Sequence, residues 1–133
     1  AMYVPEPDEI RLPWPRRFTS GEAYCATALH ELVHHSGHPS RLNREFGRRF
    51  GDAAYAFEEL VAELGCAFLL GHCGLVDATI EGHAAYLDSW RQVLKNDRTA
   101  IFPAAGHAGE AFEYILAREM PLLDSSALLP SEA

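Results

Sequence analysis

Long apolar runs and a disulfide framework are both absent from this sequence. No apolar stretch approaches the roughly 18 residues that a membrane-spanning helix requires, and the polar, proline-rich N-terminus does not resemble a secretory signal. The three cysteines, Cys25, Cys66 and Cys73, are an odd number and form no Cys-x-x-Cys pair. We therefore expect a cytoplasmic protein without membrane contacts, whose cysteines remain reduced and fill the core as small hydrophobic residues.

Positive charge is also scarce. The chain has 11 lysine and arginine residues against 19 aspartate and glutamate residues, which gives a net charge of −8. Such an acidic domain is not expected to hold nucleic acid through general electrostatic attraction. The local exception is the segment 41–49, which contains four arginines. We interpret it as a solvated basic loop; a contact strip for an acidic partner is the alternative.

The length and composition indicate one globular domain. The chain has 133 residues, of which 48% are hydrophobic and 23% are charged, as in ordinary globular proteins. We expect a single domain over residues 1–133, cut from a longer protein. Ala1 and Met2 are interpreted as a tag scar, and residues 121–133 as a loosely ordered tail.

The N-terminal part combines an extended segment with a well-marked helix. Residues 3–15 contain four prolines and alternating apolar side chains, which is typical of one or two edge strands. Thr19 and Glu22 have the spacing of a capping box, which predicts a helix from about residue 20. We expect this helix to end at residue 36, because Gly37 is suited to a C-terminal cap.

Three further helices are predicted from the spacing of apolar residues, over about residues 52–70, 80–95 and 103–118. The fold class is therefore mainly α (α+β), with about four helices and a small N-terminal β element that forms one wall of a cleft. The core stripe of the second helix is expected to consist of Phe57, Leu60, Val61, Leu64 and Phe68.

The run His30-Glu31-Leu32-Val33-His34 carries the clearest chemical signal. Residues four apart in a helix lie one above the other, about 6 Å along the axis. His30 and His34 can therefore direct two imidazoles at one metal ion, with Glu31 beside them as a general base for a zinc-bound water. This pattern predicts a zinc-dependent hydrolase; a helix with surface histidines is the alternative.

Two histidines are too few for a catalytic zinc site, which usually takes three protein ligands and keeps one position open. The long metzincin signature requires a histidine six residues after His34, but that position is Ser40. His38 is a poor candidate because Gly37 should end the helix before it can align, and His35 is a poorer one. The third ligand is therefore expected elsewhere in the chain.

The second predicted helix offers Glu59 and Glu63, which share a face with small and apolar residues. Carboxylates rarely lie on such a face unless they are paired or coordinated. We predict Glu59 as the metal ligand and Glu63 as the acceptor of a hydrogen bond from a ligand histidine. The reverse assignment and a purely structural pairing of both carboxylates are the alternatives. Glu58 is expected to point to solvent.

Three blocks of sequence, residues 26–43, 50–65 and 83–97, resemble the C-terminal domain of ArdC-type antirestriction proteins. The resemblance extends over about residues 3–116. It implies a zincin-like metallopeptidase domain of a kind carried by plasmids and phages. It also implies that the full-length relatives have a separate N-terminal domain that binds single-stranded DNA, which we expect to be absent from this chain. In the third block, Tyr86 and His83 are candidates for stabilising an oxyanion; a core tyrosine is the alternative for Tyr86.

The predicted function is a zinc-dependent metallopeptidase with a gluzincin-like third ligand. It would hydrolyse a protein or peptide substrate with a water activated by Glu31 and Zn²⁺, while the substrate backbone aligns along the N-terminal edge strand. The first alternative is a non-catalytic, zinc-stabilised module that binds a DNA-associated protein. The second is a protease that acts on DNA-linked proteins. The natural substrate, the oligomeric state and the metal used in cells are left open.

Overall fold

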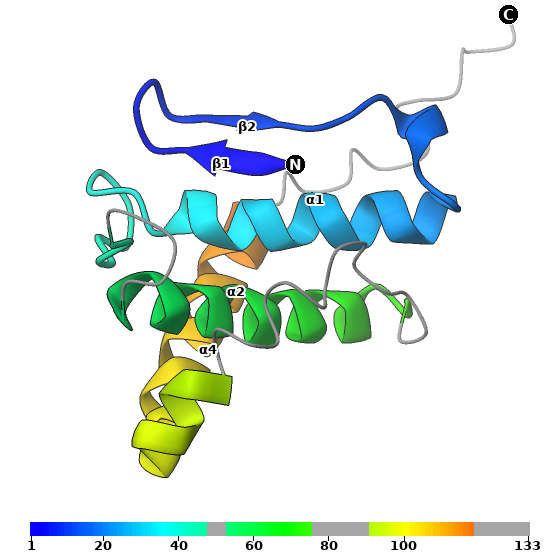
Figure 1. The fold of residues 1–133 in the computed structure, drawn as a ribbon. Helices are drawn as coiled ribbons and strands as arrows, with labels where there is room; N and C mark the ends of the chain where they lie inside the picture. The colour runs from blue at the N-terminus through cyan, green and yellow to red at the C-terminus, as the bar shows by residue number, and fades with distance from the viewer. Residues whose placement is uncertain (48–52, 76–90, 119–133) are drawn as a thin grey trace, which may run out of the picture.

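The computed structural model describes residues 1–47, 53–75 and 91–118. Its elements, in chain order, are β1 (Met2–Val4), β2 (Glu9–Arg11), η1 (Pro15–Arg17), α1 (Gly21–Ser36), α2 (Ala53–His72), η2 (Arg98–Ala100) and α4 (Ile101–Ala117). The described residues are mainly helical and form one two-stranded antiparallel sheet, which confirms the predicted fold class (Figure 1). Most of the third predicted helix falls outside the described residues, although residues 91–96 are helical. Among the helices described, none is long and apolar enough to cross a membrane.

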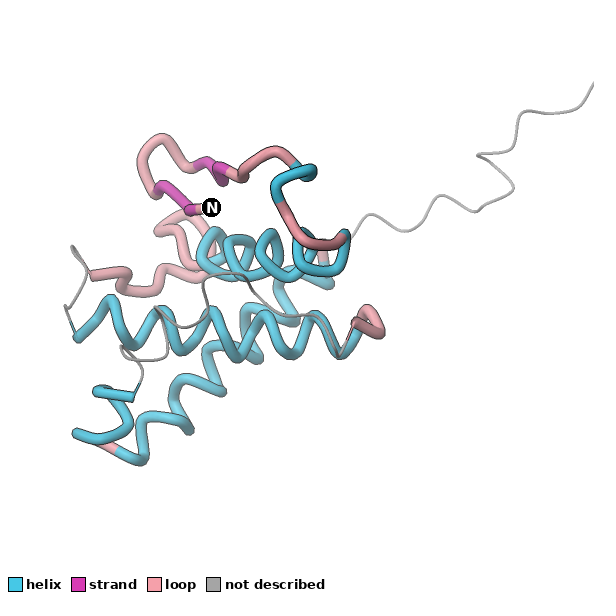
Figure 2. The backbone as a smooth tube through the Cα atoms, turned by 45° about the vertical axis from the view of Figure 1, so that its right-hand side comes forward, coloured by secondary structure: helices cyan, strands magenta, loops and turns pink. Residues whose placement is uncertain are grey.

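The position of α1 explains how the fold can build a site. α1 and α2 lie side by side, and the β1–β2 hairpin covers the side of α1 that faces away from α2 (Figures 1 and 2). α4 packs against both α1 and α2. Tyr3 of β1 pairs with Ile10 of β2. Because α1 is enclosed between a helix and a hairpin, its polar residues can be buried against partners on two sides.

Local signals set the ends of α1. The Ser20 hydroxyl accepts a hydrogen bond from the Ala23 amide at 3.0 Å, which makes Ser20 the N-cap. The predicted capping box was wrong by one residue, because the cap is Ser20 rather than Thr19, and Glu22 therefore does not occupy the third helical position. The helix ends at Ser36, as predicted, and the Gly37 amide donates to the His34 carbonyl oxygen at 2.9 Å.

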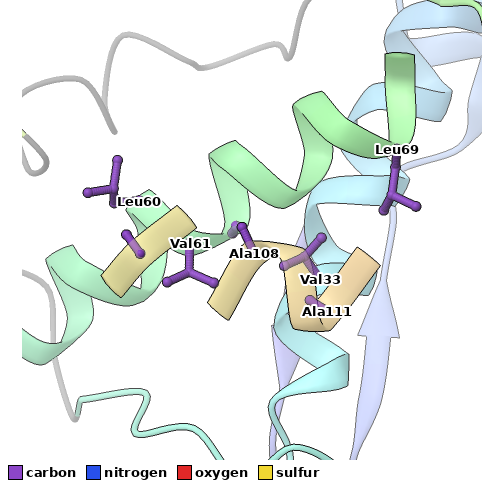
Figure 3. Close-up of a cluster of buried hydrophobic side chains, with 8 residues drawn as sticks. Val33, Leu60, Val61, Leu69, Ala108 and Ala111 are labelled. Carbon is purple, nitrogen blue, oxygen red and sulfur yellow. The ribbon is translucent and has the colours of Figure 1, made fainter. Parts of the chain in front are cut away.

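The hydrophobic core lies where α1, α2 and α4 meet (Figure 3). Small side chains of α4 let it approach the other two helices closely, because they recur at helical spacing on one face. Phe68 was predicted to lie in the core, but it is 39% exposed and contacts Phe112 at the surface instead. The fully buried cluster consists of Val33, Leu60, Val61, Ala62, Leu69, Ala104, Ala108 and Ala111.

The cysteines only partly follow the prediction. All three are free thiols, but Cys25 and Cys73 are exposed and only Cys66 is buried. The Cys66 thiol donates to the Ala26 carbonyl oxygen at 3.3 Å, at the contact between α2 and α1. Burial raises the pKa of this thiol to about 12. The core-filling interpretation therefore holds for Cys66 and is wrong for the other two.

Gly65 sets the distance between α1 and α2. A Cβ at this position would lie 3.0 Å from both methyl carbons of Val33, a fully buried and β-branched residue that cannot rotate away. We expect Gly65→Ala to lower the free energy of unfolding by about 1–3 kcal/mol through overpacking. The matched control is Gly106→Ala on α4, where nothing lies within 4 Å, and it should stabilise by about 0.5–1 kcal/mol. Urea unfolding of both variants measures the difference; stabilisation by Gly65→Ala would contradict the close contact.

Candidate metal centre

Three side chains converge between α1 and α2. His30 Nε2 and His34 Nε2 are 3.2 Å apart, and the Glu59 carboxylate lies 3.2 Å from the first nitrogen and 3.1 Å from the second. One donor atom from each residue lies within 4.8 Å of the other two, and all three residues are buried. The spacing of four on α1 places the imidazoles on one face, and α2 supplies the carboxylate from the opposite side.

The chemistry of this group fits a divalent metal ion. Two imidazole nitrogens face each other at 3.2 Å. If both carried a proton the two N–H groups would repel, and if neither did the two lone pairs would repel. Among the described residues, Glu59 Oε2 is buried without a hydrogen bond of regular geometry, although His30 Nε2 is near it. A cation at this point would satisfy all three donors. Two histidines and a glutamate are a ligand set of zinc enzymes, and manganese and iron accept the same donors.

The outer nitrogens of both histidines meet further carboxylates of α2. His30 Nδ1 lies 3.2 Å from Glu63 Oε1, and His34 Nδ1 lies 3.2 Å from Glu58 Oε1. Carboxylates in this position orient a ligand histidine and fix its tautomer. The expectation that Glu58 points to solvent was wrong, because the residue is 2% exposed. Arg44, in the segment after α1, packs against Glu58 and shields it from solvent. Helical periodicity within α2 cannot predict a contact with a separate segment.

The protonation of the site follows from these contacts. Burial alone would raise the pKa of Glu59, but its close contacts with the His30 and His34 rings outweigh burial and lower the pKa to about 2. Burial would likewise lower the pKa of His34, but Glu58 and Glu59 raise it to about 10. The pKa of His30 is also raised, against burial, by Glu59 and Glu63. Without a metal, the Glu59 carboxylate is therefore ionised and the His34 ring is protonated.

A cavity of about 290 Å³ opens onto this group. Glu31, His34 and Glu59 line it together with Met2 and Tyr3 of β1. The hairpin thus forms a wall of the cavity, as the sequence predicted. Glu31 is 4% exposed and follows His30 directly in α1. A carboxylate, a candidate metal centre and an extended strand therefore border the same cavity.

Sequence comparison agrees with this architecture. The sequence profile of a family described as zincin-like metallopeptidase (MPTase-PolyVal) matches residues 1–107, most of the chain. The chain belongs to this zincin-like metallopeptidase family. The resemblance inferred from the sequence blocks is thereby confirmed at the level of the family.

The relatives of this zincin-like domain are longer proteins. Two proteins named DNA primase TraC from Escherichia coli are 44% and 41% identical to it over 90% of the chain, which spans only 11% and 8% of their lengths. An uncharacterised protein, y4eC, from Sinorhizobium fredii is 38% identical, and the chain covers 39% of it. The chain therefore spans less than half of the length of each of these relatives.

Solved structures show the same fold. The Mn(II)-bound crystal structure of the antirestriction protein ArdC from plasmid R388 is 40% identical, with a TM-score of 0.75 over 87% of this chain and 43% of that one. The metal-free structure of the same protein is 41% identical, with a TM-score of 0.72 over 86% of this chain and 41% of that one. The zincin-like domain thus spans less than half of ArdC.

The other candidate site residues of the zincin-like domain either have partners away from the metal centre or fall outside the residues that the structure describes. His38 Nδ1 lies 2.7 Å from Ser40 Oγ, and His35 faces Tyr3. Tyr86 and His83 fall outside the described residues. Tyr55, which helical spacing places on the same face of α2 as Glu59 and Glu63, also lines the cavity. It lies four residues, or about one turn, before Glu59 on α2, and this spacing is the feature of the sequence that places the two side chains together.

The arginines of segment 41–49 that the structure describes are not solvated, in contrast to the prediction. Arg41 and Arg44 were expected to be solvated or to face an acidic partner, but their side chains are only 15% and 5% exposed. Both turn inward to ion pairs within the domain, with Asp8 and Glu58 respectively. The other two arginines of the segment lie outside the described residues.

Proposed function

We propose that this domain is a zinc-dependent metallopeptidase. His30, His34 and Glu59 are its metal ligands, Glu63 orients His30, and Glu31 is the general base. The observation that supports the proposal most directly is the cavity, in which Glu31 lies beside His34 and Glu59. A buried carboxylate next to a metal centre is the arrangement that hydrolysis of a peptide bond requires.

The residues divide the chemistry among them. When bound, a divalent ion supplies Lewis acidity, which activates water and polarises a carbonyl group. Glu31 takes a proton from the attacking water as the new C–O bond forms, and transfers it to the leaving amine nitrogen as the C–N bond breaks. β1 lines the cavity through Met2 and Tyr3 and offers an edge along which a substrate backbone can align. Tyr86 remains our predicted oxyanion donor.

The names of the relatives suggest where such a peptidase acts. A primase and an antirestriction protein contain domains similar to this one, and both names refer to processes on DNA. We propose that the domain is the peptidase module of an ArdC-like antirestriction or mobile-element protein in the cytoplasm. Its substrate would be a DNA-associated protein, and a separate domain would provide contact with single-stranded DNA. The alternative is a metal-stabilised module that binds such a protein without cleaving it.

Removal of the metal tests the catalytic proposal. Dialysis against a chelator should abolish cleavage of a randomised peptide library, as read by mass spectrometry, and one equivalent of Zn²⁺ should restore it. Free zinc at about a hundred times its dissociation constant should also stabilise the fold by about 2.7 kcal/mol, which thermal unfolding detects. Cleavage that persists in the metal-free protein would contradict the proposal. Stabilisation by zinc without any cleavage would favour the non-catalytic alternative.

A further inference from the structure

A buried arginine connects the end of α1 to the metal centre. Arg44 Nη1 donates to Ser36 Oγ at 3.0 Å, and Nη2 donates to the Val33 carbonyl oxygen at 2.6 Å. On the α2 side, Nε donates to Glu58 Oε2 at 3.0 Å and Nη2 to Glu58 Oε1 at 2.8 Å. The guanidinium therefore links the two helices that carry the metal donors.

Glu58 extends this contact to His34. The oxygen that accepts from Arg44 Nη2 is also 3.2 Å from His34 Nδ1, on the opposite side of the ring from the nitrogen that faces Glu59. A histidine that donates Nδ1–H to a carboxylate keeps the lone pair of Nε2 available for a metal. A buried carboxylate has a large desolvation cost unless a positive group faces it, and Arg44 is that group.

Gly37 makes room for the guanidinium. A Cβ at this position would lie 2.8 Å from Arg44 Nη2 and 2.9 Å from Phe46 Cζ. The φ angle of Gly37 is −86°, so this glycine is not required for the left-handed conformation that helix caps often adopt. Its lack of a Cβ instead leaves room for the guanidinium in this position. The end of α1 is thus shaped so that Arg44 can reach the Val33 carbonyl group and Glu58 together.

Arg41 provides a comparison within the same segment. Its Nε donates to the His35 carbonyl oxygen at 2.7 Å, and its guanidinium pairs with Asp8. Arg41 therefore also braces the end of α1, but toward the hairpin. Of these two arginines, Arg44 is the one whose partner touches a metal donor. Substitutions of the two arginines can therefore distinguish an effect on the metal site from a general effect on the fold.

We propose that Arg44 and Glu58 form a positioning pair that fixes the orientation of His34 and thereby increases the metal affinity of the site. Arg44 acts through Glu58, and Glu58 acts through the His34 ring. The inference rests on the proposed role of His34 as a metal ligand. It does not depend on whether the domain cleaves peptides.

Zinc affinity, measured by competition with a chromophoric chelator, tests the pair. In Glu58→Gln the amide NH₂ group must replace either the oxygen that faces Arg44 Nε or the one that faces both Arg44 Nη2 and His34 Nδ1. Each of these partners is a donor, so the contact is disrupted in both orientations and we expect affinity to fall by about 10–100-fold. Arg44→Lys keeps the charge but loses the two-pronged contact, and should lower affinity in the same direction. Arg41→Lys is the matched control and should leave affinity unchanged.

A spectroscopic readout separates positioning from loss of fold. In NMR spectra of the zinc-loaded wild type, the His34 Nδ1 proton should exchange slowly with water, and in Glu58→Gln it should exchange rapidly. Thermal unfolding of the metal-free variants reports their stability separately. Combining Arg44→Lys with Glu58→Gln should weaken binding no further than Glu58→Gln alone, because the two residues act in series.

Three outcomes would overturn the proposal. Wild-type affinity in Glu58→Gln would show that the carboxylate does not act on the site. An equal loss in Arg41→Lys would show that the effect belongs to the fold. If Glu58→Gln does not fold, Arg44→Lys decides the question, and unchanged affinity in that variant rejects the pair. Absence of zinc binding by the wild type would instead reject the metal site itself, and this proposal with it.

Discussion

Replacement of Glu31 by glutamine should lower the rate of peptide hydrolysis by about 10²–10⁴-fold, which is the usual contribution of a general base. The amide has the same shape as the carboxylate but cannot accept a proton from water at neutral pH. Since Glu31 is not among the three converging donors, metal affinity should stay close to that of the wild type. The measurement is the initial rate of peptide cleavage at saturating zinc, with bound metal determined on the same samples.

The control for this prediction is Glu22→Gln. Glu22 lies in the first turn of the same helix and is exposed, so the same chemical change should leave cleavage unaffected. Full activity in Glu31→Gln would defeat the peptidase proposal. If the wild type binds zinc but neither protein cleaves any peptide, the non-catalytic binding module becomes the better description.

Local chemistry made much of the first helix predictable from the sequence. A hydroxyl residue before the helix and a glycine after it set the limits of α1 to within one residue. Within those limits, the geometry of a helix places His30 and His34 on one face whatever surrounds them. The only local error concerned the cap, because Thr19 and Ser20 are adjacent hydroxyl residues and periodicity does not distinguish them.

Long-range features were harder to predict, because they depend on how α2 and the segment after α1 meet the first helix. The shared face of Glu59 and Glu63 was visible in the sequence, and the structure places them against opposite nitrogens of His30. Glu58 seemed to be a surface residue, since its burial depends on Arg44 in a segment without any periodicity. Phe68 follows the apolar spacing of α2, yet it lies at the exposed end of that stripe.

Zinc affinity should rise about tenfold for each pH unit between about pH 6.5 and pH 8.5, because binding displaces a proton from the site. In the metal-free protein, the pKa of His34 is about 10, so its ring is protonated throughout this range. Its nitrogen must lose that proton to bind a metal. The raised pKa of His30 can only make the dependence steeper, whereas Glu59, with a pKa of about 2, is already ionised.

The stability of the metal-free protein should change in the opposite direction. The folded-state pKa of His34 lies above its ordinary value of 6.5, so its ion pairs stabilise the fold fully below pH 6.5. That contribution declines as the pH rises toward about 10. The pKa of Glu59 is lowered, so its contribution is present above about pH 4.5 and is lost as the pH falls toward about 2. Metal-free melting temperatures should therefore fall from pH 6.5 to pH 8.5.

Two measurements link these effects to the site. Calorimetric titration with zinc in buffers of different ionisation enthalpy should show release of at least about one proton per ion at pH 7.5. The gap in melting temperature between the metal-loaded and metal-free protein should widen with rising pH. His72→Gln, at the exposed end of α2, should change neither result. A proton release near zero would mean that the buried imidazoles are already neutral or do not bind the ion, because a protonated nitrogen has no lone pair to offer.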